Sequence, residues 1–352
     1  MPRPLAIIIP CRNEERYIGR CLDSVLANDY DHRLLDIVVV DGMSTDRTRE
    51  IVAEYARKYP CVRLLDNPDK IKPTALNLGI ANTSADVVMR IDAHSLYDTQ
   101  YIPILVEGLY KHDCDNIGGI RETEPGDTVW SRAIAHAISH PFSVGNALYR
   151  TGVTGDEPRE VDTVFCGCYR RRVFERIGLF NEKLIRTQDR EFNERLRAIG
   201  GKIILVPQAR CSYFPRTPWS TYCKWNYQGS YWLYYASRFT DTKMKSWRNL
   251  LPAGFVLWHI LALIMAFTAP VLAAVMAAPI VFYWMLNAFV SVKTAMAENA
   301  WTMAPALMLL FATTHYGYGL GALHGGLAAL WQGKDVANCS PERIPEFVRK
   351  AA

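Results

Sequence analysis

The chain has 352 residues, of which 50% are hydrophobic and 21% are charged, and its formal net charge is +5. This length accommodates a domain with a large core together with a further region. A charge this small argues against nucleic acid as a partner, because nucleic-acid-binding proteins usually carry a clustered basic face.

The nine cysteines are odd in number and scattered, which is typical of a protein from a reducing compartment. The close pair Cys166 and Cys168 has one residue between its members, which is not the spacing of a structural zinc site. We therefore expect these thiols to be buried as small hydrophobic groups.

Short apolar runs alternate with amphipathic segments in the first part of the chain. In the segment after the first run, Ile18, Leu22, Val25 and Leu26 share one helical face. Strands are predicted at 5–9, 36–40, 62–65 and 87–91, and helices at 14–27, 46–59 and 73–81. Strands that alternate with helices predict an α/β domain with a mostly parallel sheet covered on both faces.

Acidic side chains follow three of these strands. Glu14 follows the first strand, Asp41 ends the second, and Asp92 and His94 follow the fourth. In parallel sheets, ligands bind beyond the carboxyl ends of the strands, so these groups predict a binding site at that edge. Asp46, by contrast, suits the start of the second helix as a cap.

Asp92 and His94 form a candidate metal site. They stand two positions apart after a strand, where both side chains can reach one ion. A carboxylate with an imidazole suits Mn²⁺ better than Ca²⁺, and Mg²⁺ also fits where a diphosphate and water supply most ligands. The alternative is a turn aspartate that caps a helix beside a surface histidine.

The composition changes near residue 216. Residues 219–247 are rich in Trp and Tyr, with cations interleaved among them, a mixture that favours a membrane interface. Between Arg248 and Lys334, only Lys293 and Glu298 are charged. We expect membrane spans at 252–268 and 271–292, and a third over 304–331 that its glycines weaken. The alternative is a buried helical bundle in a soluble protein.

Basic residues set the expected orientation of these spans. Lys243, Lys245 and Arg248 precede the first span, which predicts that the preceding domain lies on the cytoplasmic side of the inner (plasma) membrane. A third span would place the basic residues of the tail outside, so two and three spans both remain open. The expected organisation is a domain over 1–215, interface helices over 216–250, membrane helices over 251–332 and a polar tail over 333–352.

Several motifs occur in order along this pattern. They are Pro10-x-x-Asn13-Glu14, Asp41-Gly-x-Ser44-Thr45-Asp46, Asp92-x-His94, Val161-Asp-Thr-Val and Gln188-Asp189-x-Glu191. Together they resemble the GT-A (Rossmann-like) domain of family 2 glycosyltransferases over residues 1–215. The closer resemblance is to succinoglycan-type exopolysaccharide transferases. It implies an inverting transfer of one hexose from a nucleoside-diphosphate sugar to a polyprenyl-diphosphate-linked saccharide.

The resemblance also implies roles for individual residues. The expected nucleotide-sugar-binding residues are Pro10, Asn13, Glu14, Asp41 and Asp92. Lys72, just before the predicted helix at 73–81, is a further candidate for the diphosphate, and the alternative for it is a surface lysine. A UDP-sugar is favoured as donor, although uracil and guanine both offer a ring N–H to a carboxylate. Asp189 is the implied catalytic base that takes the proton of the acceptor hydroxyl. The alternative for Asp189 is a carboxylate that interacts with a helix dipole.

Candidate acceptor-binding residues lie after the fourth predicted strand: Gly167, Arg170, Gln188, Glu191, Arg216, Gln228 and Trp232. For Glu191, holding Asp189 in position is an open alternative to contact with the acceptor. Gln228-Gly-Ser-Tyr231-Trp232 resembles the Gln-x-x-Arg-Trp motif of processive synthases, but Tyr231 stands where the arginine would be. We therefore expect one sugar per encounter. The competing functions are a polyprenyl-phosphate glycosyltransferase, like dolichyl-phosphate mannose synthases, and a non-catalytic assembly scaffold.

Overall fold

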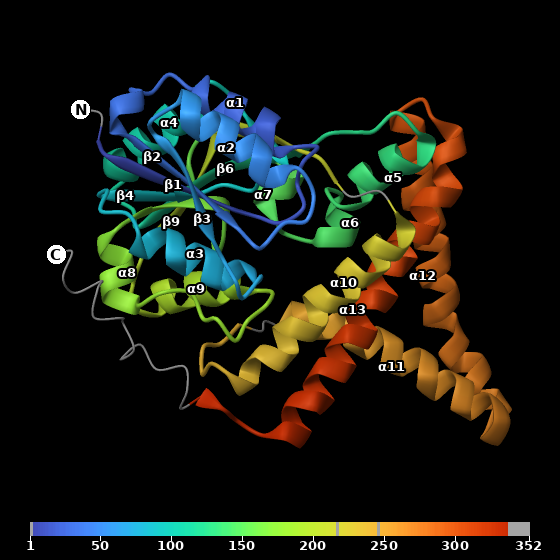
Figure 1. Cartoon of the computed structure of the whole chain (residues 1–352). Helices are drawn as coiled ribbons and strands as arrows, with labels where there is room; N and C mark the ends of the chain where they lie inside the picture. Colours follow the sequence, from blue (N-terminus) through green and yellow to red (C-terminus); the bar gives the residue numbers. More distant parts are fainter. Residues whose placement is uncertain (1–2, 216–217, 245–246, 337–352) are drawn as a thin grey trace. The chain divides into compact units, whose positions relative to one another are not determined.

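The computed structural model describes residues 3–215, 218–244 and 247–336 (Figure 1). It divides into two compact units. Among the described residues, the sheet unit comprises 3–122, 152–214 and 336, and the helical unit comprises 123–151, 215, 218–244 and 247–335. The chain passes from the sheet unit to the helical unit after residue 214, next to the boundary expected at 215. Residues 123–151 belong to the helical unit, together with the C-terminal helices.

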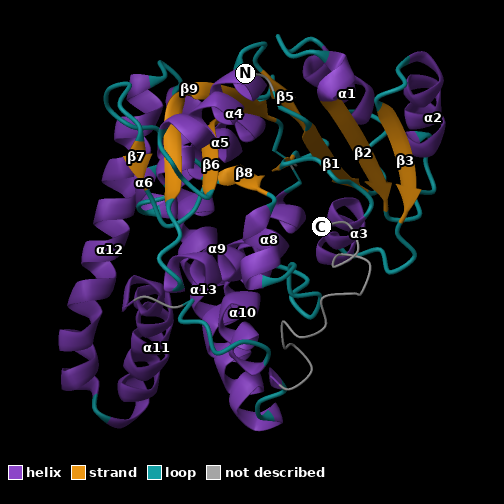
Figure 2. Ribbon diagram, turned by 90° about the vertical axis from the view of Figure 1, so that its left-hand side faces the viewer, coloured by secondary structure: helices purple, strands orange, loops and turns teal. Residues whose placement is uncertain are grey.

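The sheet unit contains a nine-stranded mixed sheet with the order β3-β2-β1-β4-β8-β6-β9-β5, in which β7 pairs with β9. Strands β1 to β4 are mutually parallel where they pair, and β8 is antiparallel to both β4 and β6 (Figure 2). The strands are β1 (Leu5–Cys11), β2 (Leu35–Asp41), β3 (Val62–Asp66), β4 (Val87–Arg90), β5 (Ser95–Tyr97), β6 (Asn116–Thr123), β7 (Arg159–Glu160), β8 (Phe165–Arg170) and β9 (Ile203–Tyr213). The alternating first part thus forms the expected parallel half, and later strands add an antiparallel half.

Helices of the sheet unit flank these strands. They are α1 (Ile18–Leu26), η1 (His32–Leu34), α2 (Thr48–Lys58), α3 (Lys72–Ala81), α4 (Tyr101–Lys111), α8 (Arg172–Ile177) and α9 (Gln188–Ala198). The predicted α2 and α3 are confirmed within two residues at each end. Helix α1 begins four residues later than predicted, because the amides of Tyr17 and Ile18 both donate to the Glu14 carbonyl in a preceding turn.

The core of the sheet unit forms on β1 and its neighbours. Residues Leu5 to Ile9 are at most 1% exposed, and successive side chains of a strand point to opposite faces, so both faces are covered. Helix α3 approaches β1 closely at Gly79, where an added Cβ would lie 2.5 Å from Ile8 Cγ2. The absent side chain therefore sets the spacing between this helix and the sheet.

The helical unit contains two sequence segments that pack on each other. Its helices are α5 (Val129–Ala137), α6 (Pro141–Val144), α7 (Leu148–Thr151), α10 (Trp219–Tyr235), η2 (Ala236–Arg238), α11 (Trp247–Thr268), α12 (Pro270–Ala297), η3 (Trp301–Met303) and α13 (Ala304–Gln332). The ring of Phe142 lies 5.2 Å from Phe311, and the Phe142 carbonyl bonds to His315 Nε2 at 2.9 Å. These contacts join the early segment to α13.

Glycines let α13 pack closely on α10. A Cβ at Gly321 or Gly325 would lie 2.3 Å from a backbone oxygen of α10. Two stretches of this unit, Arg248–Thr268 and Pro270–Ala297, are long and apolar enough to cross a membrane by length and composition. Within the part of the chain that the structure describes, α13 is not a third such helix.

Candidate active site

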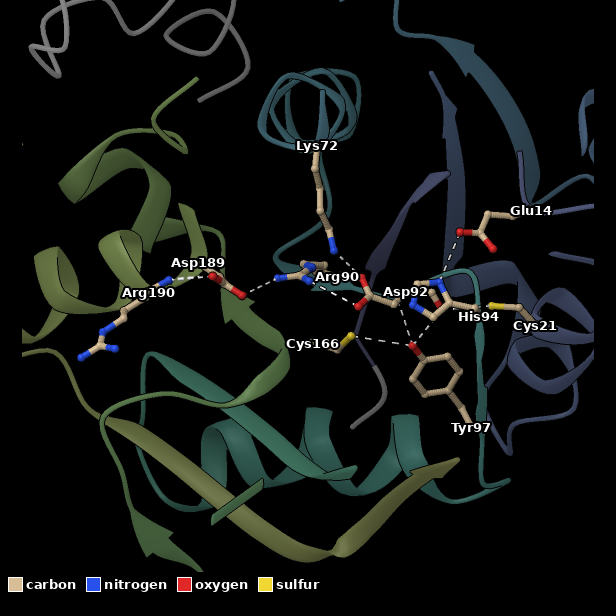
Figure 3. Close-up of polar contacts among 10 residues, drawn as sticks. All are labelled: Glu14, Cys21, Lys72, Arg90, Asp92, His94, Tyr97, Cys166, Asp189 and Arg190. Atoms are coloured by element: carbon tan, nitrogen blue, oxygen red, sulfur yellow. Dashed lines mark hydrogen bonds and ion pairs between the residues drawn. The ribbon is translucent and has the colours of Figure 1, made fainter. Parts of the chain in front are cut away.

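A chain of ion pairs lies at the carboxyl end of β4 (Figure 3). Lys72 Nζ lies 2.6 Å from Asp92 Oδ1, and a terminal guanidinium nitrogen of Arg90 lies 3.1 Å from the same oxygen. The other terminal nitrogen of Arg90 lies 3.2 Å from Asp189 Oδ2. Two carboxylates and two cations therefore alternate from α3 through β4 to α9.

Helices and strands position the residues of this row of ion pairs. Arg90 is the last residue of β4, Lys72 is the first residue of α3, and Asp189 is the second residue of α9. The backbone amide of Asp92 donates to the Tyr97 hydroxyl at 2.9 Å, which anchors the strand end. The structure thus brings together Lys72, Asp92 and Asp189, three residues that the sequence analysis selected separately.

Both carboxylates are held in the ionised form. Burial alone would raise the pKa of Asp92, but the cations of Lys72 and Arg90 outweigh burial and lower that pKa well below its usual range. Burial likewise opposes ionisation of Asp189, and Arg90 followed by Lys72 lowers its pKa. At neutral pH, Asp189 is therefore a carboxylate able to accept a proton.

His94 and Glu14 face each other beside Asp92. His94 Nδ1 lies 3.4 Å from Glu14 Oε1, and the His94 ring packs edge-on against Tyr213 at 5.2 Å. This nitrogen is buried and makes no hydrogen bond to any residue that the structure describes. A buried imidazole nitrogen beside a strand-end carboxylate is a donor set that a divalent cation can use.

The residues fit a divalent ion that takes most of its ligands from elsewhere. Over the described ranges, no cluster of three or more His, Cys, Asp and Glu side chains gathers to hold a metal. Asp92 and His94 would therefore supply two ligands, and a bound diphosphate and water would supply the others, as is usual for Mg²⁺.

Asp41 is completely covered at the end of β2. Its side chain is 0% exposed, and its carboxylate accepts from the Ser44 amide at 2.9 Å and from Arg49 at 2.8 Å. Arg49 also pairs with Asp66 at 2.8 Å. Contact between Asp41 and a nucleotide base therefore requires a covering side chain such as Arg49 to move.

Asn13 links the loops that follow β1 and β2. Its backbone has a φ of 55°, its amide donates to Ser44 Oγ at 2.8 Å, and its side-chain oxygen accepts from the Thr45 amide at 2.9 Å. Pro10 pairs with Val40 inside the sheet. The Pro10-x-x-Asn13-Glu14 motif therefore shapes the rim of the site, with Glu14 beside His94.

Two predicted acceptor-binding residues, Gly167 and Arg170, make packing and polar contacts within the sheet unit. A Cβ on Gly167 would lie 2.5 Å from Asn116 Oδ1 and 2.6 Å from the Tyr169 ring, so close packing explains the glycine. Arg170 bonds to Asp113 at 2.8 Å and to the Leu109 carbonyl at 2.9 Å. These contacts account for the placement of both residues, and their role toward an acceptor stays a prediction.

Gln188 and Glu191 lie beside Asp189 on α9 and are 4% and 2% exposed. Glu191 pairs with Arg195 at 2.8 Å, and Arg195 also bonds to the Leu179 carbonyl at 2.7 Å. This geometry favours holding the helix over direct contact with an acceptor.

The remaining acceptor candidates lie outside the sheet unit. Gln228 and Trp232 are on α10 of the helical unit, where Trp232 packs against Tyr231 and Tyr235 at 5.8 and 5.5 Å. Arg216 lies outside the described residues, as does Lys245.

Arg90 is the site residue that the sequence analysis missed. It is the one charged residue in the apolar run 87–91, two positions before Asp92. Along a strand, residues two apart point to the same face, so a cation at this spacing was a usable signal.

Comparison with known proteins defines the class. Residues 6–178 match the family model described as Glycosyl transferase family 2. The chain therefore contains a family 2 glycosyltransferase domain, which confirms the resemblance drawn from the motifs. The mannosyltransferase PcManGT of Pyrobaculum calidifontis, solved with GDP-Man and Mn²⁺, has a similar fold, with a TM-score of 0.55 at 20% identity over 89% of this chain and 87% of that one. The mixed sheet is thus of the GT-A type.

Two curated proteins are similar in sequence. The succinoglycan biosynthesis protein ExoA of Rhizobium meliloti is 31% identical over 212 residues, which are 60% of this chain and 63% of ExoA. A dolichyl N-acetyl-alpha-D-glucosaminyl phosphate 3-beta-D-2,3-diacetamido-2,3-dideoxy-beta-D-glucuronosyltransferase of Methanococcus voltae is 28% identical over 225 residues, which are 60% of this chain and 67% of that protein. The chain therefore spans less than two thirds of the length of ExoA.

Proposed function

We propose that this chain is an inverting glycosyltransferase of exopolysaccharide synthesis. It moves one hexose from a nucleoside-diphosphate sugar, with a UDP-sugar favoured, to a polyprenyl-diphosphate-linked saccharide. The observation that carries the proposal is that Arg90 forms ion pairs with two carboxylates. One is the ionised Asp189, and the other is Asp92 on the donor side. The similarity to ExoA supports the exopolysaccharide assignment.

The proposed reaction is a single displacement. The acceptor hydroxyl oxygen attacks the anomeric carbon, the bond from that carbon to the diphosphate oxygen breaks, and the nucleoside diphosphate leaves with the electron pair. Asp189 takes the hydroxyl proton as the new bond forms, because its carboxyl group is ionised and can accept a proton. Lys72 adds a positive charge at the strand end, where a diphosphate group would be attracted.

Asp92 and His94 are the residues that would hold Mn²⁺ or Mg²⁺. When bound, such an ion neutralises charge that develops on the departing diphosphate. The buried His94 Nδ1 and its neighbour Glu14 at 3.4 Å support this assignment.

A membrane location is supported by the surface of α11 and α12. Leu263, Phe267 and Val271 are 63%, 83% and 82% exposed, and water would disfavour such a continuous apolar surface. In the most apolar 18-residue stretch of each candidate span only 11% is buried, which is unlike the core helix of a soluble protein. We propose that these helices lie in the inner membrane, with the sheet unit on the cytoplasmic side.

The acceptor separates this proposal from its nearest rival, which is transfer to bare polyprenyl phosphate. The Methanococcus relative is named for a dolichyl phosphate that already carries a sugar, which favours a glycosylated acceptor. The test supplies radiolabelled UDP- or GDP-sugars with either bare polyprenyl phosphate or a glycosylated polyprenyl diphosphate. Labelling of the bare phosphate alone would reject the proposed acceptor.

Asp189→Asn tests the catalytic role. Removing a general base should lower kcat by about 10²–10⁴-fold. Asp36→Asn is a matched control, because Asp36 is 35% exposed against 40% for Asp189 and also pairs with an arginine, at 2.7 Å. Asp36 lies near the opposite end of its strand, and its variant should keep full activity. Undiminished transfer by Asp189→Asn would show that Asp189 is not the base. If the wild-type protein transfers no sugar in the donor screen, the result would favour a non-catalytic scaffold.

A further inference from the structure

Arg90 is a buried cation within an apolar strand. All four residues of β4 are buried, and Arg90 itself is 7% exposed. Removing a guanidinium group from water is costly unless carboxylates compensate its charge. The two compensating groups here are Asp92 and Asp189.

The guanidinium group contacts these two carboxylates through different nitrogens. One terminal nitrogen lies 3.1 Å from Asp92 Oδ1, and the other lies 3.2 Å from Asp189 Oδ2. Asp92 follows the same strand, whereas Asp189 is 99 residues further along the chain, on α9. A planar guanidinium group fixes the direction between two acceptors, which a single ammonium group cannot do.

We propose that Arg90 is a positioning residue for sugar transfer, which holds the Asp189 carboxylate in a fixed relation to the donor-binding end of β4. This inference rests on the proposed function, in which Asp189 is the base and Asp92 lies on the donor side. A misplacement of about 1 Å between reacting groups can cost about 10²-fold in rate. A rigid connection between the two carboxylates therefore matters more for kcat than for binding.

Other charged and titratable groups around Asp189 do not replace this connection. Lys72 on α3 bonds to Asp92, and Tyr169 on β8 is an uncharged neighbour. The backbone amide of Arg190 donates to the second carboxylate oxygen of Asp189 at 2.9 Å, while its side chain points away in Figure 3. Only Arg90, among the groups drawn there, links Asp189 to β4.

The first test compares Arg90→Lys with Arg90→Met. Lysine keeps a positive charge but loses the two-pronged contact, so both variants should lose kcat by about 10²-fold. The acceptor KM and the affinity for UDP with Mn²⁺, measured by calorimetry, should stay within a few fold. Full kcat in Arg90→Lys would overturn the proposal, because charge alone would then suffice. If Arg90→Met does not fold, the lysine variant still decides.

A matched control is Arg171→Met. Arg171 is also partly buried and directly follows β8, but it bonds to the Ala85 carbonyl and the Thr83 hydroxyl, both at 2.6 Å, and among the described residues it bonds to no carboxylate. This variant should lower the thermal unfolding temperature and leave kcat unchanged. A drop in kcat as large as that of the Arg90 variants would show a general loss of packing and overturn the proposal.

The second test combines Arg90→Met with Asp189→Asn. If Arg90 acts through Asp189, its loss should not lower the residual rate of Asp189→Asn further, because effects within one unit are not additive. A further loss of about 10²-fold would overturn the positioning role. Full activity of Asp189→Asn alone would instead reject the proposed base, so the two failures are distinguishable.

Discussion

Glu191→Gln should destabilise the sheet unit without impairing acceptor binding. Glu191 is 2% exposed, and one of its oxygens lies 2.8 Å from Nε of Arg195, which is 21% exposed. Breaking a buried ion pair costs about 3–5 kcal/mol, and a hydrogen bond to a charged group contributes about 1.5–3 kcal/mol. Arg195 is partly exposed and keeps its bond to the Leu179 carbonyl, so we expect a loss of about 2–3 kcal/mol.

The assay is thermal unfolding together with acceptor kinetics. For a domain of this size, each kcal/mol lowers Tm by about 2–4 °C, so Tm should fall by roughly 4–12 °C. The control is Glu194→Gln on the same helix, whose partner Arg197 is 45% exposed. Exposed pairs contribute at most about 1 kcal/mol, so this variant should change Tm little.

A double-mutant cycle sharpens the result. Arg195→Met combined with Glu191→Gln should lose less stability than the sum of the single variants, because no buried charge is left without its partner. An unchanged Tm in Glu191→Gln with a roughly tenfold higher acceptor KM would refute this reasoning. Glu191 would then contact the acceptor.

Further outcomes are expected for the metal site, for the pH dependence of stability and for the packing of α3. His94→Ala should change the ratio of the transfer rate measured with Mn²⁺ to the rate measured with Mg²⁺, and an unaltered ratio would argue that the imidazole is not a ligand. Removing divalent ions with a chelator should abolish transfer by the wild-type protein. The pKa values of Asp92 and Asp189 are lower in the folded than in the unfolded chain, so their stabilising contribution is complete above about pH 4 and is lost as pH falls further. Tm should drop over that range, and Asp92→Asn should flatten the drop. Gly79→Ala should cost about 1–3 kcal/mol, because its Cβ would lie 2.5 Å from Ile8 Cγ2, and an unchanged Tm would contradict the close packing.

Local periodicity predicts the parallel half of the sheet well. The runs that became β1 to β4 are apolar and separated by amphipathic helices, so their type and order follow from short windows of sequence. The antiparallel half depends on pairings between distant segments. Strand β6 carries two glycines and β7 has two residues, so neither presents a clear alternating pattern.

Motif spacing locates the site but not its internal contacts. The order of Asp92, His94 and Asp189 predicts three candidate site residues, and the structure joins Asp92 to Asp189 through Arg90. Gly167 shows the limit of such reasoning, since a glycine before a basic run looks like a place for substrate. Its neighbour Asn116 lies on β6 and comes close to Gly167 only through the pairing of β6 with β8.

The helical unit is made of two segments that are far apart in the sequence, so the ribosome completes the first segment long before the second. Helix α5 buries Ala133, Ile134 and Ala137, and α13, on which it packs, begins only at Ala304. At about 5–20 residues per second, the ribosome needs roughly 10–30 s to reach that helix. During this interval the apolar side of α5 has no permanent cover. A fragment that stops near residue 215 would stay in that condition, so an isolated sheet unit calls for a short linker in place of residues 123–151.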